Sequence, residues 1–362
     1  MDIERFLHAA AQHKASDLHL QAESPPMLRV NGVLMPLRAE AVTTEDIRDA
    51  FRQVASERVQ ALVEKRRSAD FAYLLPEVSR FRVNAFYERE RLSLAFRLIP
   101  LTVPTFAELH LPPVVEEIAQ TERGLVLVTG TTSSGKSTTL AAVVDYLNAR
   151  ERLRIVTIED PIEFVHTSKK SLVAQREVGS DTPGFLEALR RALRQDPDLI
   201  MVGELRDLET VKTGLRAADT GHMVYSTVHT TNAAQTVQRL IALFPPNERE
   251  LLLTQLSMNL VAVISQRLAR TRDGKALVPV VEVLRTSPVV RKMILENRPS
   301  ALPQAMANRE QGMQLFDVHL AALFKAKIIS GEEALRLATN QEALALAMRG
   351  ITSADTSPGL VR

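Results

Sequence analysis

A loop bracketed by two glycines constrains this chain more than any other segment. It reads Gly130-Thr-Thr-Ser-Ser-Gly-Lys-Ser-Thr138, after the apolar run Leu125–Val128 and before the helix-forming run Leu140–Leu147. The spacing is that of the phosphate-binding loop, whose backbone N–H groups surround the phosphates of a nucleotide. A strand ahead and a helix behind are the context that this loop requires, so the segment predicts an enzyme that binds a nucleoside triphosphate.

The residues of the loop have separate expected roles. Lys136 reaches the β and γ phosphate oxygens, and Ser137 offers its hydroxyl to Mg²⁺. The backbone of the whole loop contacts the phosphates at the start of the helix. The predicted nucleotide-binding residues are Gly130, Thr131, Thr132, Ser133, Ser134, Gly135, Lys136, Ser137 and Thr138.

Composition excludes several classes of protein. At 362 residues the chain is long enough for two or three folded units. Its 45 Lys and Arg against 43 Asp and Glu give a formal net charge of +2, so no field of one sign attracts nucleic acid or anionic lipid. The absence of cysteine excludes disulfides and Cys-ligated zinc. Without an export signal or an apolar run of ~18 residues, membrane contact is expected only through a partner.

Periodicity divides the chain into five expected parts. The first reads as a small α+β unit, with a helix over Thr44–Lys65 and a hairpin formed by Phe81–Tyr87 and Leu92–Arg97. A proline-rich stretch follows, and then strands and helices alternate, which is typical of a parallel sheet with crossover helices. The expected boundaries are 1–98 for the first unit, 99–113 for a linker, 114–278 for the α/β core, 279–349 for a helical region and 350–362 for a loose tail.

A carboxylate follows a second apolar strand of the core. Leu199–Val202 runs into Gly203 and Glu204. An acid at such a strand end can orient the water that attacks the γ-phosphate. Because glycine occupies the usual aspartate position, Glu204 is the leading candidate for the catalytic base or the water-positioning residue. The alternative is an ordinary surface glutamate at the end of a strand.

Three carboxylates follow a third apolar strand. Ile155–Ile158 is followed by Glu159, Asp160 and Glu163. The carboxyl ends of parallel strands face the ligand crevice, and acids this close repel one another unless a cation is near. Glu159 and Glu163 are therefore candidate ligands of Mg²⁺ together with Ser137. The alternative is a solvated loop with an Asp-Pro turn.

Two histidines flank a fourth strand, within Thr220–Thr231. His229 follows the strand, where its ring can hydrogen-bond the γ-phosphate. We favour a functional role for His229. His222 precedes the strand, and the sequence leaves open whether its role is functional or structural.

These segments together resemble the secretion ATPase family, and most closely its type IV pilus retraction members. The similarity extends over most of the chain and is carried by Ala15–Leu20, Arg80–Phe86, the phosphate loop, Thr157–His166, Gln175–Val178, Val202–Thr210, Thr220–His222 and Gly312–Gln314. It implies an α/β fold in which a RecA-like P-loop ATPase core follows an N-terminal, PAS-like α+β domain and precedes a helical C-terminal region.

The resemblance also implies residue roles. Lys136, Ser137, Glu163 and Glu204 carry hydrolysis of ATP, and His222 and His229 form a histidine box. Arginines of the N-terminal domain reach the nucleotide, a role that falls on Arg82 and Arg97, with Arg80 a weaker candidate. The alternative for Arg82 and Arg97 is a set of salt bridges within the face of their own hairpin.

As a function, the resemblance implies a cytoplasmic homohexameric motor that lies peripherally at the inner membrane. It would hydrolyse ATP with Mg²⁺ and drive pilin disassembly through an inner-membrane platform protein, powering twitching motility. A paralogous retraction ATPase is an optional further partner. The alternatives are an accessory retraction ATPase, a paralogue for DNA uptake or surface sensing, and a scaffold that binds ATP without turnover. A ring that translocates nucleic acid is disfavoured by the near-neutral charge.

Two departures from the retraction members are visible. The loop carries Thr131 and Ser133 where those proteins usually have proline and glycine, but its lysine and hydroxyl are kept. A C-terminal helix linked to retraction is partly retained, in Arg291, Ile294 and Glu296. With the short N-terminal domain and the lack of zinc cysteines, this favours pilus disassembly over assembly.

Overall fold

The structure is a computed structural model that describes residues 1–30, 32–76, 78–99 and 102–350. These residues form two compact units, one of Met1–Thr102 with Glu163–Val165 and one of Val103–Ile162 with the chain from His166 onward. Residues 100 and 101 of the expected linker 99–113, and all but the first residue of the expected tail 350–362, lie outside the described ranges. Each unit is described by itself below.

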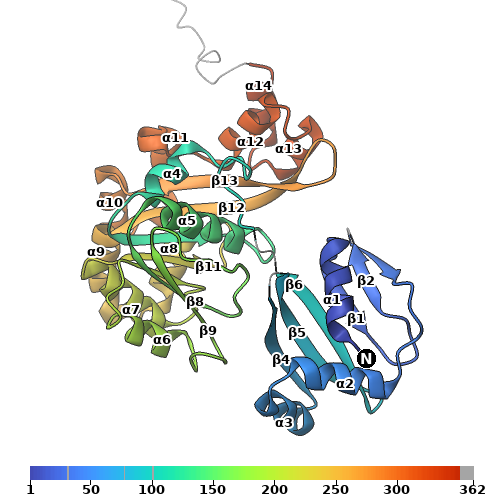
Figure 1. Ribbon diagram of the computed structural model, residues 1–362. Helices are drawn as coiled ribbons and strands as arrows, with labels where there is room; N and C mark the ends of the chain where they lie inside the picture. Colours follow the sequence, from blue (N-terminus) through green and yellow to red (C-terminus); the bar gives the residue numbers. More distant parts are fainter. Residues whose placement is uncertain (31, 77, 100–101, 351–362) are drawn as a thin grey trace, which may run out of the picture. The chain divides into compact units, whose positions relative to one another are not determined.

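The first unit is an antiparallel sheet with three helices (Figure 1). The strand order is β3-β2-β1-β6-β5-β4. The helices are α1 (Ile3–Gln12), α2 (Thr44–Val54) and α3 (Glu57–Arg66), and the strands are β1 (Asp17–Leu20), β2 (Met27–Val30), β3 (Val33–Pro36), β4 (Ser68–Leu75), β5 (Ser79–Glu88) and β6 (Arg91–Ile99).

The single helix expected over Thr44–Lys65 is wrong. The helix ends at Val54 and a new one begins at Glu57, because the Ser56 hydroxyl accepts a hydrogen bond from the Val59 N–H and so caps a second helix. Strand β4 was also not expected. It pairs with β5 at the edge of the sheet.

Alternation along the strands gives this sheet two unlike faces. Leu18, Phe96 and Val83 lie opposite one another across β1, β6 and β5, and all three are buried in the core. Their neighbours in sequence point to the other face because successive side chains of a strand alternate. Asp17 and Arg97 meet there, so the second face is polar.

The second unit is a seven-stranded sheet with helices on both faces (Figure 1). Its strand order is β13-β12-β7-β11-β10-β8-β9, and every neighbouring pair is parallel except β12 with β13. The strands are β7 (Gly124–Thr129), β8 (Arg154–Glu159), β9 (Leu172–Glu177), β10 (Leu199–Val202), β11 (Met223–Val228), β12 (Leu260–Arg270) and β13 (Leu277–Arg285). The expected α/β class is confirmed.

The helices of this unit divide into layers. They are α4 (Pro113–Ala119), α5 (Lys136–Arg150), α6 (Phe185–Ala192), α7 (Leu208–Asp219), α8 (Ala233–Leu243), α9 (Arg249–Asn259), α10 (Pro288–Leu295), α11 (Leu302–Ala307), α12 (Phe316–Lys325), α13 (Gly331–Leu337) and α14 (Gln341–Met348). Helices α4 and α5 share a core with Val126 and Val128, whereas α6 to α11 share one with Leu125 and Leu127. The two faces of β7 are therefore covered by different helices. No helix in the described part of the chain is long and apolar enough to cross a membrane.

The helical region expected to start at residue 279 is wrong at its beginning. Strand β13 occupies Leu277–Arg285 and pairs with β12, and the next helix starts only at Pro288. The run contains buried valines at 278, 280, 281 and 283. Valine favours extended backbone, and a free strand edge of β12 is available to it.

A histidine beneath this strand makes the stability of the fold depend on pH. His319 of α12 is buried, and its Nδ1 accepts the Val281 N–H at 3.0 Å. Burial lowers its pKa from 6.5 to about 4. The folded state therefore binds this proton only below about pH 4, whereas the unfolded chain binds it below about pH 6.5. The free energy of unfolding is thus highest above pH 6.5 and falls as the pH is lowered toward 4.

We expect the free energy of unfolding to fall by ~3 kcal/mol across this window on account of His319. Urea unfolding followed by circular dichroism at several pH values measures the slope. The His319→Gln variant keeps a hydrogen-bond acceptor but does not titrate, so its slope should be shallower. Equal slopes for the two proteins would assign the acid sensitivity to other groups.

Candidate active site

The phosphate loop joins β7 to α5. Gly130 has φ 151° and Gly135 has φ 84°, backbone conformations that a side chain rarely adopts. A Cβ on Gly130 would also lie 2.3 Å from the Ser134 hydroxyl and 2.5 Å from the Gln266 carbonyl oxygen. Glycine is therefore required there for space as well as for conformation. Gly135 caps the helix, so the loop ends at a helix N-terminus, where an anion is favourably bound.

Lys136 and Ser137 begin helix α5. Lys136 is buried, and its ammonium donates to the carbonyls of Gly130 at 3.1 Å and Thr131 at 2.8 Å. The charge is thereby held against the loop itself. Ser137 follows at partial exposure. The loop places both side chains at the helix terminus where phosphates would lie.

The remaining loop positions are more open. Thr131, Thr132 and Ser133 are exposed, and Ser134 is buried. Ser133 has φ 61°, a left-handed conformation that costs a residue with a side chain about 1–2 kcal/mol. Glycine would adopt it more easily, which gives a physical reason for glycine at this position in related loops.

Glu204 lies just past the end of β10, and its side chain is buried. It forms an ion pair with Arg206, and its Oε2 lies 3.7 Å from Nε2 of His229. The glycine before it is explained by packing, because a Cβ on Gly203 would lie 3.1 Å from the ring of Phe185. An aspartate at 203 would crowd that ring.

His229 follows β11 at the same edge of the sheet. It lines a cavity of about 420 Å³ together with Thr131, Thr132, Thr230 and Thr231. Burial lowers the pKa of His229 below its usual value, and the positive charge of Lys136 lowers it further. The ring is therefore neutral near pH 7. The structure thus brings Lys136, Glu204 and His229 together beside the loop, from three different strand ends.

The acidic segment at the end of β8 is placed less favourably for binding one Mg²⁺ ion together with Ser137. Glu159 at the end of β8 accepts hydrogen bonds from Thr157 Oγ1 at 2.6 Å and Gln175 Nε2 at 3.0 Å. Strands β11 and β10 separate β7 from β8, which sets the two strands roughly 14 Å apart at ~4.8 Å per strand. Mg²⁺ binds its ligands at about 2.1 Å, so the sheet order argues against direct binding of one ion by both Ser137 and Glu159.

Glu163 belongs to the segment that clusters with the first unit, and it is exposed. Within the described ranges, no three His, Asp or Glu side chains come close enough to hold a metal by themselves. Ser137, in the first turn of α5 next to the loop, is placed to contact a Mg²⁺ ion that is carried by nucleotide phosphates. Binding of that ion by Glu163 stays a prediction.

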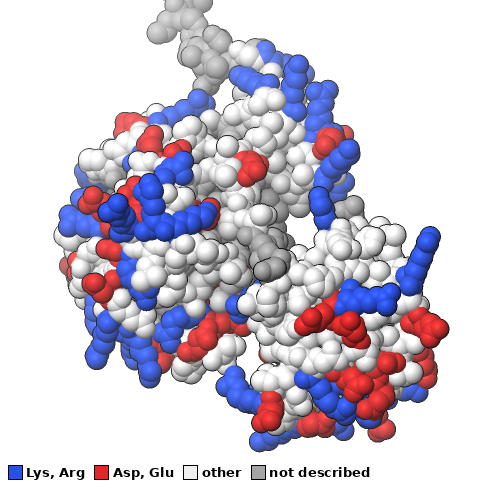
Figure 2. Space-filling view, in the orientation of Figure 1, with Lys and Arg blue, Asp and Glu red and all other residues white. Residues whose placement is uncertain are grey.

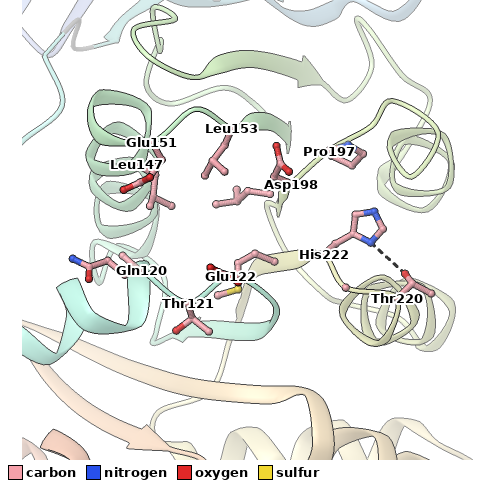
Figure 3. Close-up of a pocket in the computed structure, with 14 residues that line it drawn as sticks. Gln120, Thr121, Glu122, Leu147, Glu151, Leu153, Pro197, Asp198, Thr220 and His222 are labelled. Atoms are coloured by element: carbon pink, nitrogen blue, oxygen red, sulfur yellow. Dashed lines mark hydrogen bonds between the residues drawn. The ribbon is translucent and has the colours of Figure 1, made fainter.

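His222 lies at the opposite edge of the sheet from His229. It precedes β11 while His229 follows it, so the two are separated by the strand's six residues, roughly 20 Å. His222 lines a cavity of about 690 Å³, and Figure 3 shows its ring hydrogen-bonded to Thr220. Its Nδ1 lies 3.2 Å from the Thr220 hydroxyl and 3.0 Å from the Ala217 carbonyl oxygen. Within one copy of the chain, His222 therefore lies too far from the loop to contact the same phosphate as His229, and its role stays open.

Arg82 and Arg97 lie directly opposite each other on β5 and β6, on the polar face of the first unit. Arg97 donates from Nε to Asp17 Oδ1 at 3.0 Å, and Nε of Arg82 lies 3.6 Å from Asp70. The partners lie on β1 and β4, so these salt bridges join the hairpin to its neighbouring strands and are not within the hairpin itself. They occupy the Nε edge, and the Arg97 side chain is still 68% exposed, so its terminal amino groups remain accessible.

The carboxylates that hold these arginines were not predicted as site residues. Asp17 lies in Ala15–Leu20, one of the segments that carry the family resemblance, and its alternation with Leu18 places it on the polar face. Burial acts to raise the pKa of Asp17, but hydrogen bonds from Ser16 and Arg97 and the nearby charges of Arg97 and His19 together lower it below its usual value. The signal available in the sequence was an acid at the start of a short strand in which polar and apolar residues alternate, Asp17–Leu20.

Comparisons with known proteins extend over nearly the whole chain. The family model described as type II/IV secretion system protein matches residues 1–343. The type IV pilus retraction ATPase PilT of Pseudomonas aeruginosa is 44% identical over 335 residues, which cover 92% of this chain and 97% of that protein. The twitching motility protein of Neisseria gonorrhoeae is 44% identical over 320 residues, 88% of this chain and 86% of that protein.

A solved structure agrees with these relatives. The crystal structure of the pilus retraction motor PilT with bound ADP superposes with a TM-score of 0.87 at 41% identity, covering 94% of this chain and 98% of that one. The predicted resemblance to the secretion ATPase family is confirmed.

Proposed function

The chain belongs to the family of type II/IV secretion system proteins, and on that premise we propose that it is an ATPase that powers retraction of a type IV pilus. One observation carries the proposal. Lys136, Glu204 and His229 meet beside a complete phosphate loop, in a chain that is 44% identical to the retraction ATPase PilT over 92% of its length.

The chemistry is hydrolysis of the γ-phosphate of ATP. Lys136 neutralises phosphate charge, and the loop N–H groups hold the β and γ phosphates. Glu204 orients the attacking water and accepts its proton as the new P–O bond forms and the bond to the β-phosphate oxygen breaks, giving ADP and phosphate. His229, neutral near pH 7, contacts the γ-phosphate and so distinguishes ATP from ADP.

Mg²⁺, when bound with ATP, neutralises charge on the β and γ phosphate oxygens. Ser137 is the residue of this chain that would hold it, at the first turn of α5. Glu159 would at most orient water molecules bound to that ion, because Thr157 and Gln175 already donate hydrogen bonds to its carboxylate.

We further propose a homohexamer in which Arg82 and Arg97 of one copy face the nucleotide of its neighbour. A guanidinium held by a carboxylate at its Nε edge keeps two parallel N–H donors, the geometry that suits a phosphate. Binding of ATP would then draw neighbouring copies together and hydrolysis would release them. A cycle around the ring performs work on an inner-membrane platform protein, at the cytoplasmic face.

The near-neutral net charge of +2 does not favour a nucleic-acid motor. On the face shown in Figure 2, basic and acidic side chains are interspersed over both units. A strand-tracking channel needs a continuous basic groove. This supports a protein partner over a nucleic acid.

A deletion strain tests the direction of the motor. We expect cells without this protein to keep their pili, in excess, and to lose surface motility, because pilin would no longer be withdrawn. The unaltered gene should restore motility, and a Glu204→Gln copy should not. Pilus counts by electron microscopy and surface spreading measure the two outcomes.

Cells without pili would reverse the proposed direction, because only an assembly motor is needed to build them. Cells with normal pili and normal motility would assign the protein an accessory role instead.

A further inference from the structure

Strand β12 lies beside β7 and continues past the point where β7 turns into the phosphate loop. The two strands are parallel, with Ser265 opposite Thr129. Gln266 is therefore level with the start of the loop, and it is only 2% exposed. Nothing in the sequence motifs marked this residue.

The side-chain amide of Gln266 joins the two halves of the nucleotide-binding element. Its Nε2 donates to the carbonyl oxygen of Ser134 at 2.8 Å, in the loop. Its Oε1 accepts from the Thr139 hydroxyl at 2.9 Å, in the first turns of α5. All three side chains are buried, so water does not compete for these bonds.

The approach of Gln266 is close enough to account for a loop glycine. A Cβ on Gly135 would lie 2.8 Å from Nε2 of Gln266. A side chain at 135 would displace the amide, so glycine and glutamine fit as a pair.

The bond to Ser134 sets the direction of a donor that phosphate needs. The Ser134 carbonyl and the Gly135 N–H belong to one planar trans peptide, so they point in opposite directions. Holding the carbonyl toward Gln266 directs the Gly135 N–H away from β12. Backbone N–H groups of this loop are the phosphate ligands.

We propose that Gln266 is a positioning residue for nucleotide binding, which holds the Ser134–Gly135 peptide in the orientation that donates to phosphate. The proposal rests on the proposed nucleotide site. Only a side chain that carries both a donor and an acceptor at its tip serves Ser134 and Thr139 at once. Glutamate of the same shape keeps the acceptor and loses the donor, and methionine loses both.

Titration of the full-length protein with a fluorescent ADP analogue tests this. Gln266→Met should weaken the affinity about ten-fold or more, since it leaves the Ser134 carbonyl buried without its donor. Gln266→Glu should weaken it at least as much, because it adds a negative charge beside the phosphates. Thr139→Val removes only the hydroxyl that donates to Gln266 Oε1, so it should weaken ADP affinity less than either Gln266 variant. In steady-state assays the KM for ATP should rise more than kcat falls.

Ser265→Ala is the matched control. It changes the neighbouring residue of β12, whose hydroxyl accepts from Thr129 at 3.0 Å and does not touch the loop. Its ADP affinity should stay within about two-fold of the parent. Thermal unfolding without nucleotide measures how much stability Gln266→Glu loses by burying a carboxylate beside the Ser134 carbonyl, so that this loss is separated from the change in affinity.

If the parent and both Gln266 variants bind ADP equally, or if the variants lose thermal stability without losing affinity, the positioning role is wrong. Gln266→Glu preserves the packed shape, so it answers the question even where Gln266→Met does not fold. A parent that binds no ADP would instead contradict the proposed function.

Discussion

Replacing Glu204 with glutamine should leave ATP binding intact and lower ATP hydrolysis at least ~100-fold, the usual scale for a lost general base or water-positioning group. The variant keeps the size of a buried side chain, but its amide no longer accepts a proton from water. Because Glu204 forms an ion pair with Arg206 and faces His229, the substitution also weakens two contacts of that carboxylate. Phosphate release and equilibrium ATP binding, measured on the same preparation, separate the two effects.

Two companion variants define the outcome. Lys136→Ala should lose both binding and hydrolysis, because it removes the cation at the β and γ phosphates. Glu209→Gln changes an exposed carboxylate of α7 and should hydrolyse ATP at the parent rate. Turnover by Glu204→Gln near that of the parent would reject Glu204 as the base and pass the role to Glu163.

The phosphate loop and its strand were predictable because the information is local. The two glycines, the lysine and the serine are adjacent in sequence, and the flanking apolar runs define the strand and the helix around them. The position of Glu204 near the loop was also predictable, since the carboxyl ends of parallel strands lie at one edge of a sheet. Chain direction alone brings such residues to the same side.

Strand order was not predictable in this way. Glu159 and Glu204 both end a parallel strand, yet β10 lies closer to β7 than β8 does. Only the order distinguishes a residue near the loop from one farther along the edge. The resemblance grouped His222 with His229, and only the bounds of β11 reveal that the two lie at opposite ends of one strand.

Long-range partners were beyond the sequence for a different reason. Gln266 lies 132 positions after Ser134, and Asp17 lies 80 before Arg97. Each pair forms only because two strands become neighbours in a sheet. The apolar run of β13 illustrates a further limit, since a short run of valines fits a buried helix or a strand until its neighbour is known.

Replacing Arg97 with alanine should lower ATP hydrolysis by about 10³-fold, the scale of a lost arginine finger, while nucleotide still binds to the loop of the same chain. Asp17 holds Arg97 by its Nε edge, so the guanidinium is oriented before any phosphate reaches it. An oriented donor loses less conformational entropy when it meets its ligand. Phosphate release and ADP titration on the purified ring measure the two quantities.

Mixing two inactive proteins decides whether this arginine acts across a subunit boundary. A Lys136→Ala copy keeps Arg97, and an Arg97→Ala copy keeps its phosphate loop, so a mixed ring contains sites that take one intact part from each. Such rings should regain activity. A mixture of Lys136→Ala with Glu204→Gln is the control, because both defects lie in the same unit of the chain and no neighbour restores them. Recovery only in the first mixture establishes a shared site. If neither mixture regains activity although two affinity tags verify that mixed rings form, the salt bridge with Asp17 is the whole role of Arg97.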